Sequence, residues 1–367
     1  MTTKKDIESA LMRGADTLRD TIDAANYKDY VLPVMFVKYL SDSYTDAVEE
    51  LSKQYSGIRL ERQKKYLPFM VAEGCSFYDL YQQRFADNIG QLMNAAMRQI
   101  EADNNQQLAG VLSAVDYNSE NALGTREHKN AILRDLLEDF EPLDLRPSAI
   151  EVKEGQVPAD VIGDAYEYMI GQFASMAGKK AGSFYTPAAV SEIMARIVDV
   201  QPGERVYDPT CGSGSLLIKA AKKQNSKEVS IYGQEVNGSS VAMAKMNMYI
   251  HEIRDAKIGW GDTLANPVFL DADGNLLLFD AIVANMPFSK DKWASGFNPG
   301  GESSGKGKKE FKMEASLDKF HRFDWGVPPA SKGDWAFLLH MIASLSVNGQ
   351  IAAVAPHGVL FRGAAEG

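Results

Sequence analysis

Asn285 opens a short segment whose residue types could activate a poorly nucleophilic amine. The stretch "FDAIVANMPFS" (279–289) begins as an apolar strand and then turns into Asn285, Met286, Pro287 and Phe288. The amino group of a base has its lone pair delocalised into the ring. Two acceptors, the Asn285 side-chain oxygen and the next main-chain carbonyl, can hold its two hydrogens and favour a tetrahedral nitrogen. Phe288 can then stack on a base that has left its duplex.

A glycine-rich turn precedes this segment in the chain. The stretch "ERVYDPTCGSGSLLIKAA" (204–221) predicts a strand, a turn with Gly212 and Gly214, and a helix. Glycines let a ligand approach the backbone, and the helix amino end favours an anionic group. A tight turn without a ligand is the alternative. A dinucleotide site would need Gly or Ala where Leu217 stands, so the sequence disfavours NAD.

Two carboxylates follow at spacings that suit a nucleoside. Glu235 ends "VSIYGQE", roughly twenty residues beyond the glycines, where a carboxylate can accept both hydroxyls of a ribose. Asp262, in "IGWGDTL", follows the next expected strand and could accept from an adenine amino group. Singly, each is also an ordinary acid at a strand end or turn, and Asn-x-Pro is also an ordinary proline turn. Their ordered coincidence favours a ligand site.

Alternating strand and helix patterns position these residues. Residues 1–150 have a helical period, with Ile7, Leu11, Ala15 and Leu18 on one face. Beyond residue 200, β-branched runs alternate with helical patterns, which predicts a parallel sheet covered by helices. We expect strands at 204–208, 229–234, 279–284 and 350–355, and helices near 187–199, 214–224, 238–252 and 335–346. Two domains are therefore predicted, at 1–150 and 151–367. Because the chain ends at "FRGAAEG", directly after a strand-like segment, we expect a truncated product.

Composition narrows the class of protein. The chain has 367 residues, of which 45% are hydrophobic and 24% charged, as in ordinary globular proteins. The apolar stretch 30–39 is too short to span a bilayer, and residues 1–14 do not form a secretory signal. Two distant cysteines and five scattered histidines give no disulfide framework and no metal-ligand spacing. These features predict a cytoplasmic protein without a metal or a membrane segment. A net charge of −10 argues against a chain that coats nucleic acid unaided.

The motif "DPTCGSG" followed by "NMPF" resembles the amino-group methyltransferases of DNA, which use S-adenosylmethionine. Their usual tetrapeptide is Asn/Asp-Pro-Pro-Tyr/Phe, and Met286 departs from it. That position contributes its carbonyl, and a residue before Pro287 is already biased towards extended dihedrals, so the chemistry should survive. What changes is rigidity, because methionine leaves φ free. The order of the motifs, together with Asn285, resembles the enzymes that methylate adenine at N6.

The chain is more closely similar to the modification subunit of type I restriction-modification systems, over nearly its whole length. The strings "YKDYVLPVMFVKYLSD" (27–42) and "DAYEYMIGQFASMAGKKAGSFYTP" (164–187) carry this resemblance. It implies an α/β Rossmann-like methyltransferase domain, with a mostly parallel sheet and helices on both faces, preceded by an all-α domain. It also implies three groups of site residues: Tyr185, Thr186 and Pro187 against the methionine part of the cofactor; Asp208, Gly212, Gly214, Glu235 and Asp262 around the rest of it, with Glu235 on the ribose and Asp262 on the adenine; and Asn285, Met286, Pro287 and Phe288 in the target pocket. From the residues alone, Thr186 also fits a helix cap, with Pro187 as first helical residue.

The same resemblance implies the partners. They are DNA, a specificity subunit that reads the sequence, a restriction subunit, and two modification subunits per complex. A modification subunit of this kind need not be basic. The Gly-, Ser- and Lys-rich segment 290–333 predicts a mobile loop. It could close over a flipped base, touch phosphates through Lys306, Lys308 and Lys309, or stay a solvated insert. Trp325 and Trp335 are expected to dock its later half.

Two other functions compete with DNA methylation. Glutamine methyltransferases of release factors use the same logic for a delocalised amide nitrogen. The long helical region and the string "GKKAGSFYTP" disfavour them here. The second alternative is a non-catalytic assembly scaffold, which Met286 and the end at Gly367 keep open.

Overall fold

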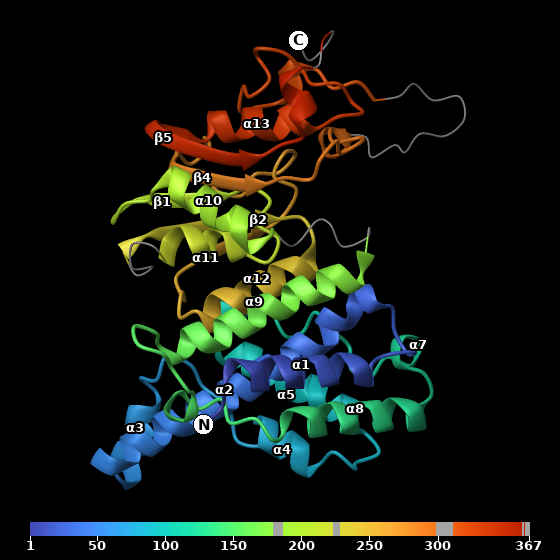
Figure 1. The fold of residues 1–367 in the computed structure, drawn as a ribbon, viewed down its shortest axis with the longest axis vertical. Helices are drawn as coiled ribbons and strands as arrows, with labels where there is room; N and C mark the ends of the chain where they lie inside the picture. The colour runs from blue at the N-terminus through green and yellow to red at the C-terminus, as the bar shows by residue number, and fades with distance from the viewer. Residues whose placement is uncertain (179–185, 223–227, 299–310, 362, 364–367) are drawn as a thin grey trace. The chain divides into compact units, whose positions relative to one another are not determined.

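The computed structural model describes residues 1–178, 186–222, 228–298, 311–361 and 363, and its contacts divide the chain into two compact units (Figure 1). A helical unit comprises residues 1–185 together with 245–254. A sheet unit comprises residues 186–244 and 255–367. The contacts place the first boundary after residue 185 and assign residues 245–254 to the helical unit. The domain division at residue 150 that the sequence suggests stays a prediction.

Amphipathic helices build the helical unit. The predicted apolar face of the first helix is buried, with Ile7, Leu11 and Leu18 fully enclosed. Thr3 caps this helix in a reciprocal capping box with Asp6, which satisfies orphan N–H groups of the first turn. The helices are α1 (Lys4–Thr17), α2 (Tyr27–Gln54), α3 (Gly57–Lys64), α4 (Phe77–Gln82), α5 (Ile89–Asp103), α6 (Asn105–Leu108), α7 (Glu120–Leu123), α8 (Arg126–Phe140) and α9 (Pro158–Met176).

The sheet unit contains the expected parallel sheet. Its strands run in the order β3-β2-β1-β4-β5, and every recorded pairing between them is parallel. The strands are β1 (Arg205–Asp208), β2 (Ser230–Glu235), β3 (Lys257–Trp260), β4 (Phe279–Asn285) and β5 (Leu345–Val354). Helix α10 (Ala188–Val198) precedes β1, and three helices connect strands: α11 (Ser215–Lys222), α12 (Gly238–Ile250) and α13 (Asp334–Ala343). The contacts assign residues 245–254, which include the later part of α12, to the helical unit.

The four strands and four helices predicted with bounds in this region are confirmed, with shifts at their ends, whereas β3 was expected before Asp262 but without bounds. Strand β5 begins at Leu345, earlier than the expected residue 350, and α13 ends correspondingly early at Ala343. The early start pairs Phe279 of β4 with Leu345, and a register shift between Phe279 and Ala281 absorbs the extra residues. The sequence pattern missed this because an irregular register breaks the alternation of polar and apolar residues.

The strand order creates a switch point between β1 and β4. The chain winds outwards from β1 through β2 to β3, and then returns to the other side through β4 and β5. In open parallel sheets, ligands bind outside the carboxyl ends of the strands at such a point. The rings of Tyr207 and Phe279 stack beneath it, with centroids 4.3 Å apart. The loops after β1 and β4 therefore leave the sheet side by side from a packed base.

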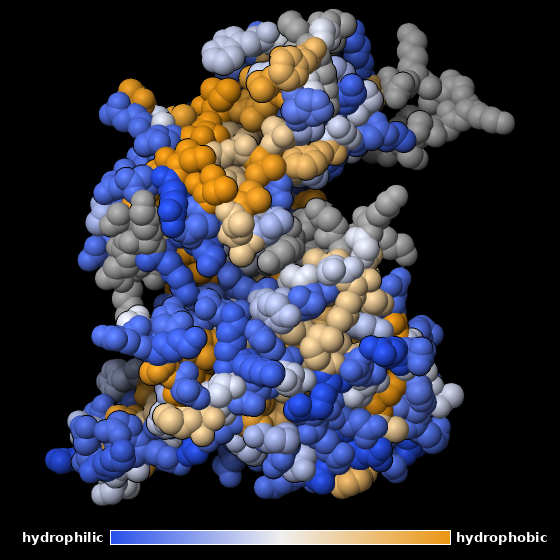
Figure 2. All heavy atoms as spheres, viewed as in Figure 1, coloured by the Kyte–Doolittle hydropathy of each residue, from blue (hydrophilic) through white to orange (hydrophobic). Residues whose placement is uncertain are grey.

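The surface of the two units differs in character. Figure 2 shows hydrophobic side chains gathered over α10 and β5 of the sheet unit, where Ile193, Ile197 and Val347 are exposed. The helical unit presents mainly hydrophilic side chains in the same view. Within the described residues, no helix combines the length and apolar character needed to cross a membrane.

Candidate active site at the carboxyl edge of the sheet

Asp208 ends β1 and begins the predicted glycine turn. Its side chain is 2% exposed, and its Oδ1 accepts a hydrogen bond from the Thr210 N–H at 2.8 Å. Gly212 and Gly214 have φ values of +52° and +75°, a region that favours glycine. The turn leads directly into α11, whose first residue is Ser215. The strand, turn and helix are thus arranged as the sequence predicts.

Glu235, at the end of the neighbouring strand β2, reaches across to this turn. Its Oε2 accepts from the Gly212 N–H at 3.1 Å, and its Oε1 accepts from the Asn237 N–H at 2.8 Å. Burial raises the pKa of Glu235, and hydrogen bonds from backbone N–H groups oppose that rise. Two candidate residues from separate strands are thereby brought together.

The two buried carboxylates form an unbalanced group of charge. The pKa of Asp208 is raised to about 7, mainly by burial; the hydrogen bond from the Thr210 N–H opposes this rise, and the charge of Glu235 adds to it. Among the described residues, no cation forms an ion pair with Asp208 or Glu235. Burying charge without a partner is unfavourable. The pair therefore suits a ligand that brings hydroxyl donors or positive charge.

Asp262 lies in the turn that follows β3. Its Oδ1 accepts from the N–H groups of Leu264 at 2.9 Å and Ala265 at 3.4 Å, which fixes the turn. Gln234 ties this turn to β2, because its Nε2 donates to the Gly261 carbonyl at 3.2 Å and to the Asn266 carbonyl at 2.9 Å. No sequence pattern indicated Gln234. Gln234 is fully buried at the end of β2, and its role depends on contacts with a turn that lies far away in the sequence.

Asn285 ends β4 with a partly exposed side chain. Its Nδ2 donates to Thr186 Oγ1 at 3.3 Å, so Oδ1 is available to accept a hydrogen from a ligand. Thr186 is not the helix cap. Pro187 occupies that position instead, and its carbonyl accepts from the N–H groups of Val190 and Ser191. The hydroxyl of Thr186 faces Asn285 rather than the helix, which is the physical reason for the correction. Tyr185 lies outside the described residues.

The other three residues of the tetrapeptide have separate surroundings. Met286 is 2% exposed and packs in the core of the sheet unit with Trp293, Phe337 and their neighbours. Pro287 is half-buried, whereas the Phe288 side chain is 51% exposed. An exposed ring beside a strand end is free to stack on a planar ligand. The methionine thus serves as core packing, a function that a proline at this position would fill less fully.

The insert after the tetrapeptide is closed at its base. The Ser289 N–H donates to Asp334 Oδ1 at 2.7 Å, and the Lys292 N–H donates to the Ala330 carbonyl at 2.9 Å. Trp293 is fully buried, and its Nε1 donates to the Pro329 carbonyl at 2.9 Å. The described parts of the insert are therefore anchored to the sheet unit. Residues 299–310 lie outside the described residues, and the mobile loop stays a prediction.

Of the two tryptophans predicted to dock the later half of this insert, Trp325 is wrong. Trp293 docks it, whereas Trp325 is 82% exposed. Sequence cannot distinguish these two tryptophans, because the difference arises from packing against the sheet. Trp335 is half-buried on α13. The lysines proposed to touch phosphates, Lys306, Lys308 and Lys309, lie outside the described residues.

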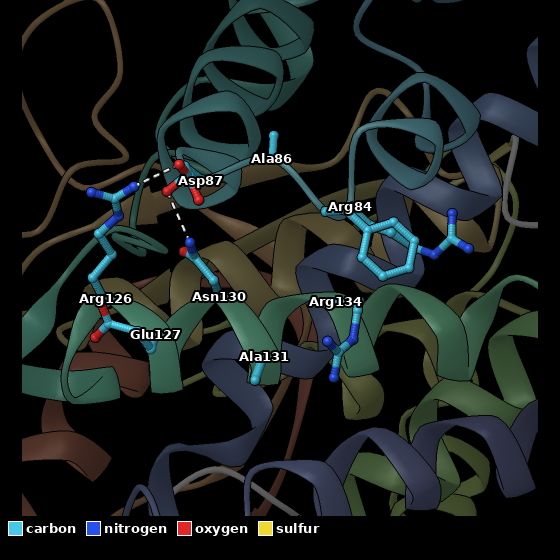
Figure 3. A pocket seen from close by; sticks show the side chains of 9 residues that line it. Arg84, Ala86, Asp87, Arg126, Glu127, Asn130, Ala131 and Arg134 are labelled. Carbon is cyan, nitrogen blue, oxygen red and sulfur yellow. Dashed lines mark hydrogen bonds and ion pairs between the residues drawn. The ribbon is translucent and has the colours of Figure 1, made fainter.

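A surface pocket of about 350 Å³ lies elsewhere, in the helical unit (Figure 3). Arg126 pairs with Asp87 at 2.8 Å, and Asn130 donates to the Asp87 carbonyl at 2.8 Å. Arg84 pairs with Glu138 at 3.0 Å. The charges around this pocket are thus largely compensated, and none of the predicted site residues lines it. Across the described residues, no group of His, Cys, Asp and Glu could hold a metal ion.

A parallel sheet with a switch point, a glycine turn after β1 and a buried carboxylate at the end of β2 defines an α/β protein with the fold of nucleoside-cofactor enzymes. Residues 157–367 match the family model described as N-6 DNA Methylase, and residues 7–140 match the HsdM N-terminal domain. The chain therefore belongs to the N-6 DNA methylase family.

Relatives with similar sequences are methylase subunits of type I restriction enzymes. The MjaVIII methylase subunit of Methanocaldococcus jannaschii is 29% identical over 97% of this chain and 57% of its own length. The MpnII methylase subunit of Mycoplasma pneumoniae is 29% identical over 97% of this chain and 68% of its own. The chain thus spans little more than half of the first relative.

A solved structure shares the fold of the whole chain. The type I restriction-modification system methyltransferase subunit from Streptococcus thermophilus superposes with a TM-score of 0.77 at 30% identity. The match covers 100% of this chain and 77% of that one. The resemblance stated from the sequence motifs is thereby confirmed at the level of the family.

Proposed function

We propose that this chain is the modification subunit of a type I restriction-modification complex and transfers a methyl group to N6 of adenine in DNA. One observation carries the proposal most directly. The Asn285 side chain keeps Oδ1 available at the end of β4. Strand β4 pairs with β1, and the glycine turn that follows β1 donates a hydrogen bond to Glu235. The proposal assigns the methyltransferase domain to residues 151–367 and a helical domain to residues 1–150.

The residues at the sheet edge fit S-adenosylmethionine as cofactor. Asp208 and Glu235 are buried carboxylates without a cationic partner among the described residues, and a ligand with ribose hydroxyls and positive charge would compensate them. Glu235 would accept from the ribose, and Asp262 from the adenine amino group. Gly212 and Gly214 keep the backbone open to the ligand. Tyr185, Thr186 and Pro187 would border its methionine part.

The chain's own residues would prepare the target amine. When bound, the cofactor supplies an electrophilic methyl group on a sulfonium sulfur. The Asn285 Oδ1 and the Met286 carbonyl would accept the two amino hydrogens and draw the nitrogen lone pair out of the ring. Phe288 would stack on the flipped base, and Pro287 would restrict the backbone between them. Held by Asp208, Glu235 and Asp262, the cofactor would supply the methyl group to the prepared nitrogen, and the amine would release one proton to water.

The partners follow from this assignment. We propose that DNA is the substrate, that a specificity subunit reads its sequence, and that a restriction subunit joins two modification subunits in the complex. The net charge of −10 supports a division of labour, because an acidic chain binds duplex DNA weakly by itself. The place of such a complex is the cytoplasm, where it meets chromosomal and incoming DNA.

Methylation of mixed-sequence DNA tests the proposal. The chain is incubated with labelled S-adenosylmethionine, with and without a specificity subunit, and the modified base is identified. N6-methyladenine that depends on the specificity subunit is the expected result. Tight, sequence-specific binding by the isolated chain at physiological salt would contradict the division of labour. Transfer to a protein acceptor in a parallel reaction would indicate a glutamine methyltransferase, and cofactor binding without any transfer would indicate a scaffold.

A further inference from the structure

Arg322 lies in the insert after the tetrapeptide and is enclosed by the sheet unit. Its side chain is fully buried and forms an ion pair with Asp318, with Nη2 (NH2) 2.8 Å from Oδ1. Its Nε also donates to the Asp318 carboxylate at 3.1 Å. The remaining donors point away from this partner. A buried guanidinium of this kind is held in one geometry by its many hydrogen bonds.

Those remaining donors contact the turn that presents Asp262. NH1 donates to the Thr263 carbonyl at 3.3 Å, and NH2 donates to the Leu264 carbonyl at 2.5 Å. On the other side of the same turn, the Leu264 N–H donates to Asp262 Oδ1. The turn is therefore held from both sides, by its own carboxylate and by Arg322. The Asp262 carboxylate keeps Oδ2 without a hydrogen bond to any described residue.

A third contact ties Arg322 to the centre of the sheet. NH1 lies 3.1 Å from His340 Nδ1, and His340 Nε2 lies 3.2 Å from the Tyr207 hydroxyl. Arginine can only donate, so Nδ1 accepts and Nε2 carries the proton towards Tyr207. Burial, with the nearby charge of Arg322, holds the pKa of His340 well below its usual value and keeps the imidazole neutral. The chain of contacts thus reaches β1, whose end begins the glycine turn.

We propose that Arg322 is a positioning residue that fixes the Asp262 turn and thereby sets how strongly the site prefers a ligand with an adenine amino group. This inference rests on the proposed function, in which Asp262 accepts from the cofactor adenine. In this role Arg322 acts through the turn, because its contacts are with Asp318, with His340 and with the turn carbonyls. It also links the insert beyond the target pocket to the cofactor side of the site, because Asp318 and Arg322 both belong to that insert.

The test compares two ligands that differ at the adenine amino group. Calorimetry gives the Kd of S-adenosylhomocysteine and of S-inosylhomocysteine, which carries an oxygen in place of that group. We expect the wild-type protein to prefer the adenine ligand by about 10-fold or more, as for a hydrogen bond to a charged acceptor. Asp262→Ala should abolish the preference.

Arg322→Lys should reduce the preference to about 3-fold or less, because a single ammonium cannot contact Asp318, His340 and both carbonyls together. The matched control is Arg196→Lys on α10, where the arginine is exposed and pairs with Glu192, and its preference should equal that of the wild type. If Arg322→Lys fails to unfold cooperatively, Asp318→Asn takes its place and should give an intermediate preference, because it frees Arg322 from one anchor.

Several outcomes would overturn the inference, and they can be told apart. Equal weakening of both ligands in a folded Arg322→Lys variant would indicate a merely structural arginine. An unchanged preference in that variant would contradict a positioning role. A wild-type protein that binds the adenine ligand without preference would refute the role of Asp262, and one that binds neither ligand would refute the proposed cofactor itself.

Discussion

The two units each bury a cluster of charge, and the clusters differ in balance. In the helical unit, Lys38 and Asp42 are both fully buried and lie 2.6 Å apart. Tyr78 contacts both partners, and the Leu145 N–H donates to Asp42 at 2.7 Å. In the sheet unit, Asp208 and Glu235 are buried without a paired cation among the described residues. The first cluster contains its own ion pair, whereas the second has none among the described residues, and Lys290 acts on Glu235 only as a minor influence that lowers its pKa.

The difference separates structural charge from charge that serves a ligand. A buried cation and anion that satisfy one another hold helices in place but offer nothing to a third group. Two carboxylates that accept from backbone N–H groups and from the Thr210 hydroxyl still have acceptor capacity left, and their burial is unfavourable. A suitable ligand would use that capacity and offset the cost of burial. The Arg322–Asp318 pair shows that the sheet unit can also build a balanced cluster. The imbalance at Asp208 and Glu235 is therefore local to the sheet edge.

The largest effect is expected from breaking the balanced cluster of Lys38 and Asp42 in the helical unit. Lys38→Met leaves the Asp42 carboxylate buried without its cation, and should lower the free energy of unfolding by about 3–5 kcal/mol. Denaturant titration followed by circular dichroism measures the loss. The control is Lys53→Met at the exposed end of α2, where the side chain is 69% accessible and little change is expected. A loss below about 1 kcal/mol for Lys38→Met would show that the pair is not needed for stability.

Asn285→Ala removes the acceptor proposed for the target amine. We expect methyl transfer by the assembled complex to fall by about 10²–10³-fold, as when a positioned polar group is lost from a transition state. Cofactor affinity should stay nearly unchanged, because the ligand contacts of Asp208 and Glu235 remain. Asn275→Ala, in an exposed turn bonded to Asp271, is the matched control. Joint loss of transfer and cofactor binding would point to misfolding rather than to catalysis.

The elements of the sheet unit were predictable because each depends on local pattern. Apolar strands, the glycine turn and the positions of Glu235 and Asn285 at strand ends could be read from neighbouring residues. Arg322 and Trp293 could not, because their roles arise from contacts across the fold, such as Arg322 with Thr263. The Thr186 cap was wrong for the same reason, since Asn285 attracts its hydroxyl.

Asp208→Asn tests the unbalanced cluster through pH. The pKa of Asp208 is about 7 in the folded protein and near 3.9 in an unfolded chain, so the folded state binds more protons between these values. Its contribution to stability is therefore present below about pH 4 and is lost as the pH rises to about 7. The variant should lose this pH dependence and be more stable than the wild type at pH 8, by about 1–3 kcal/mol.

Thermal melting from pH 4 to pH 8 checks this result, and cofactor binding sharpens it. A positively charged ligand favours the ionised carboxylate, so binding to the wild type at pH 6.5 should release protons, which calorimetry in two buffers detects. Proton release should be smaller in Asp208→Asn. A stability profile with the same slope in both proteins would show that Asp208 is not protonated in the folded state.

The smallest effect is expected at Phe288, whose exposed ring contrasts with the buried ion pairs Lys38–Asp42 and Arg322–Asp318. Phe288→Ala should change the free energy of unfolding by less than about 0.5 kcal/mol, because half of the side chain is already in water. It should weaken the capture of a flipped base by about 1 kcal/mol through lost stacking. Fluorescence of 2-aminopurine at the target position reports base capture by the assembled complex, and Phe288→Trp should preserve the signal that Phe288→Ala reduces. Equal capture by both variants would mean that the ring faces solvent without meeting the base.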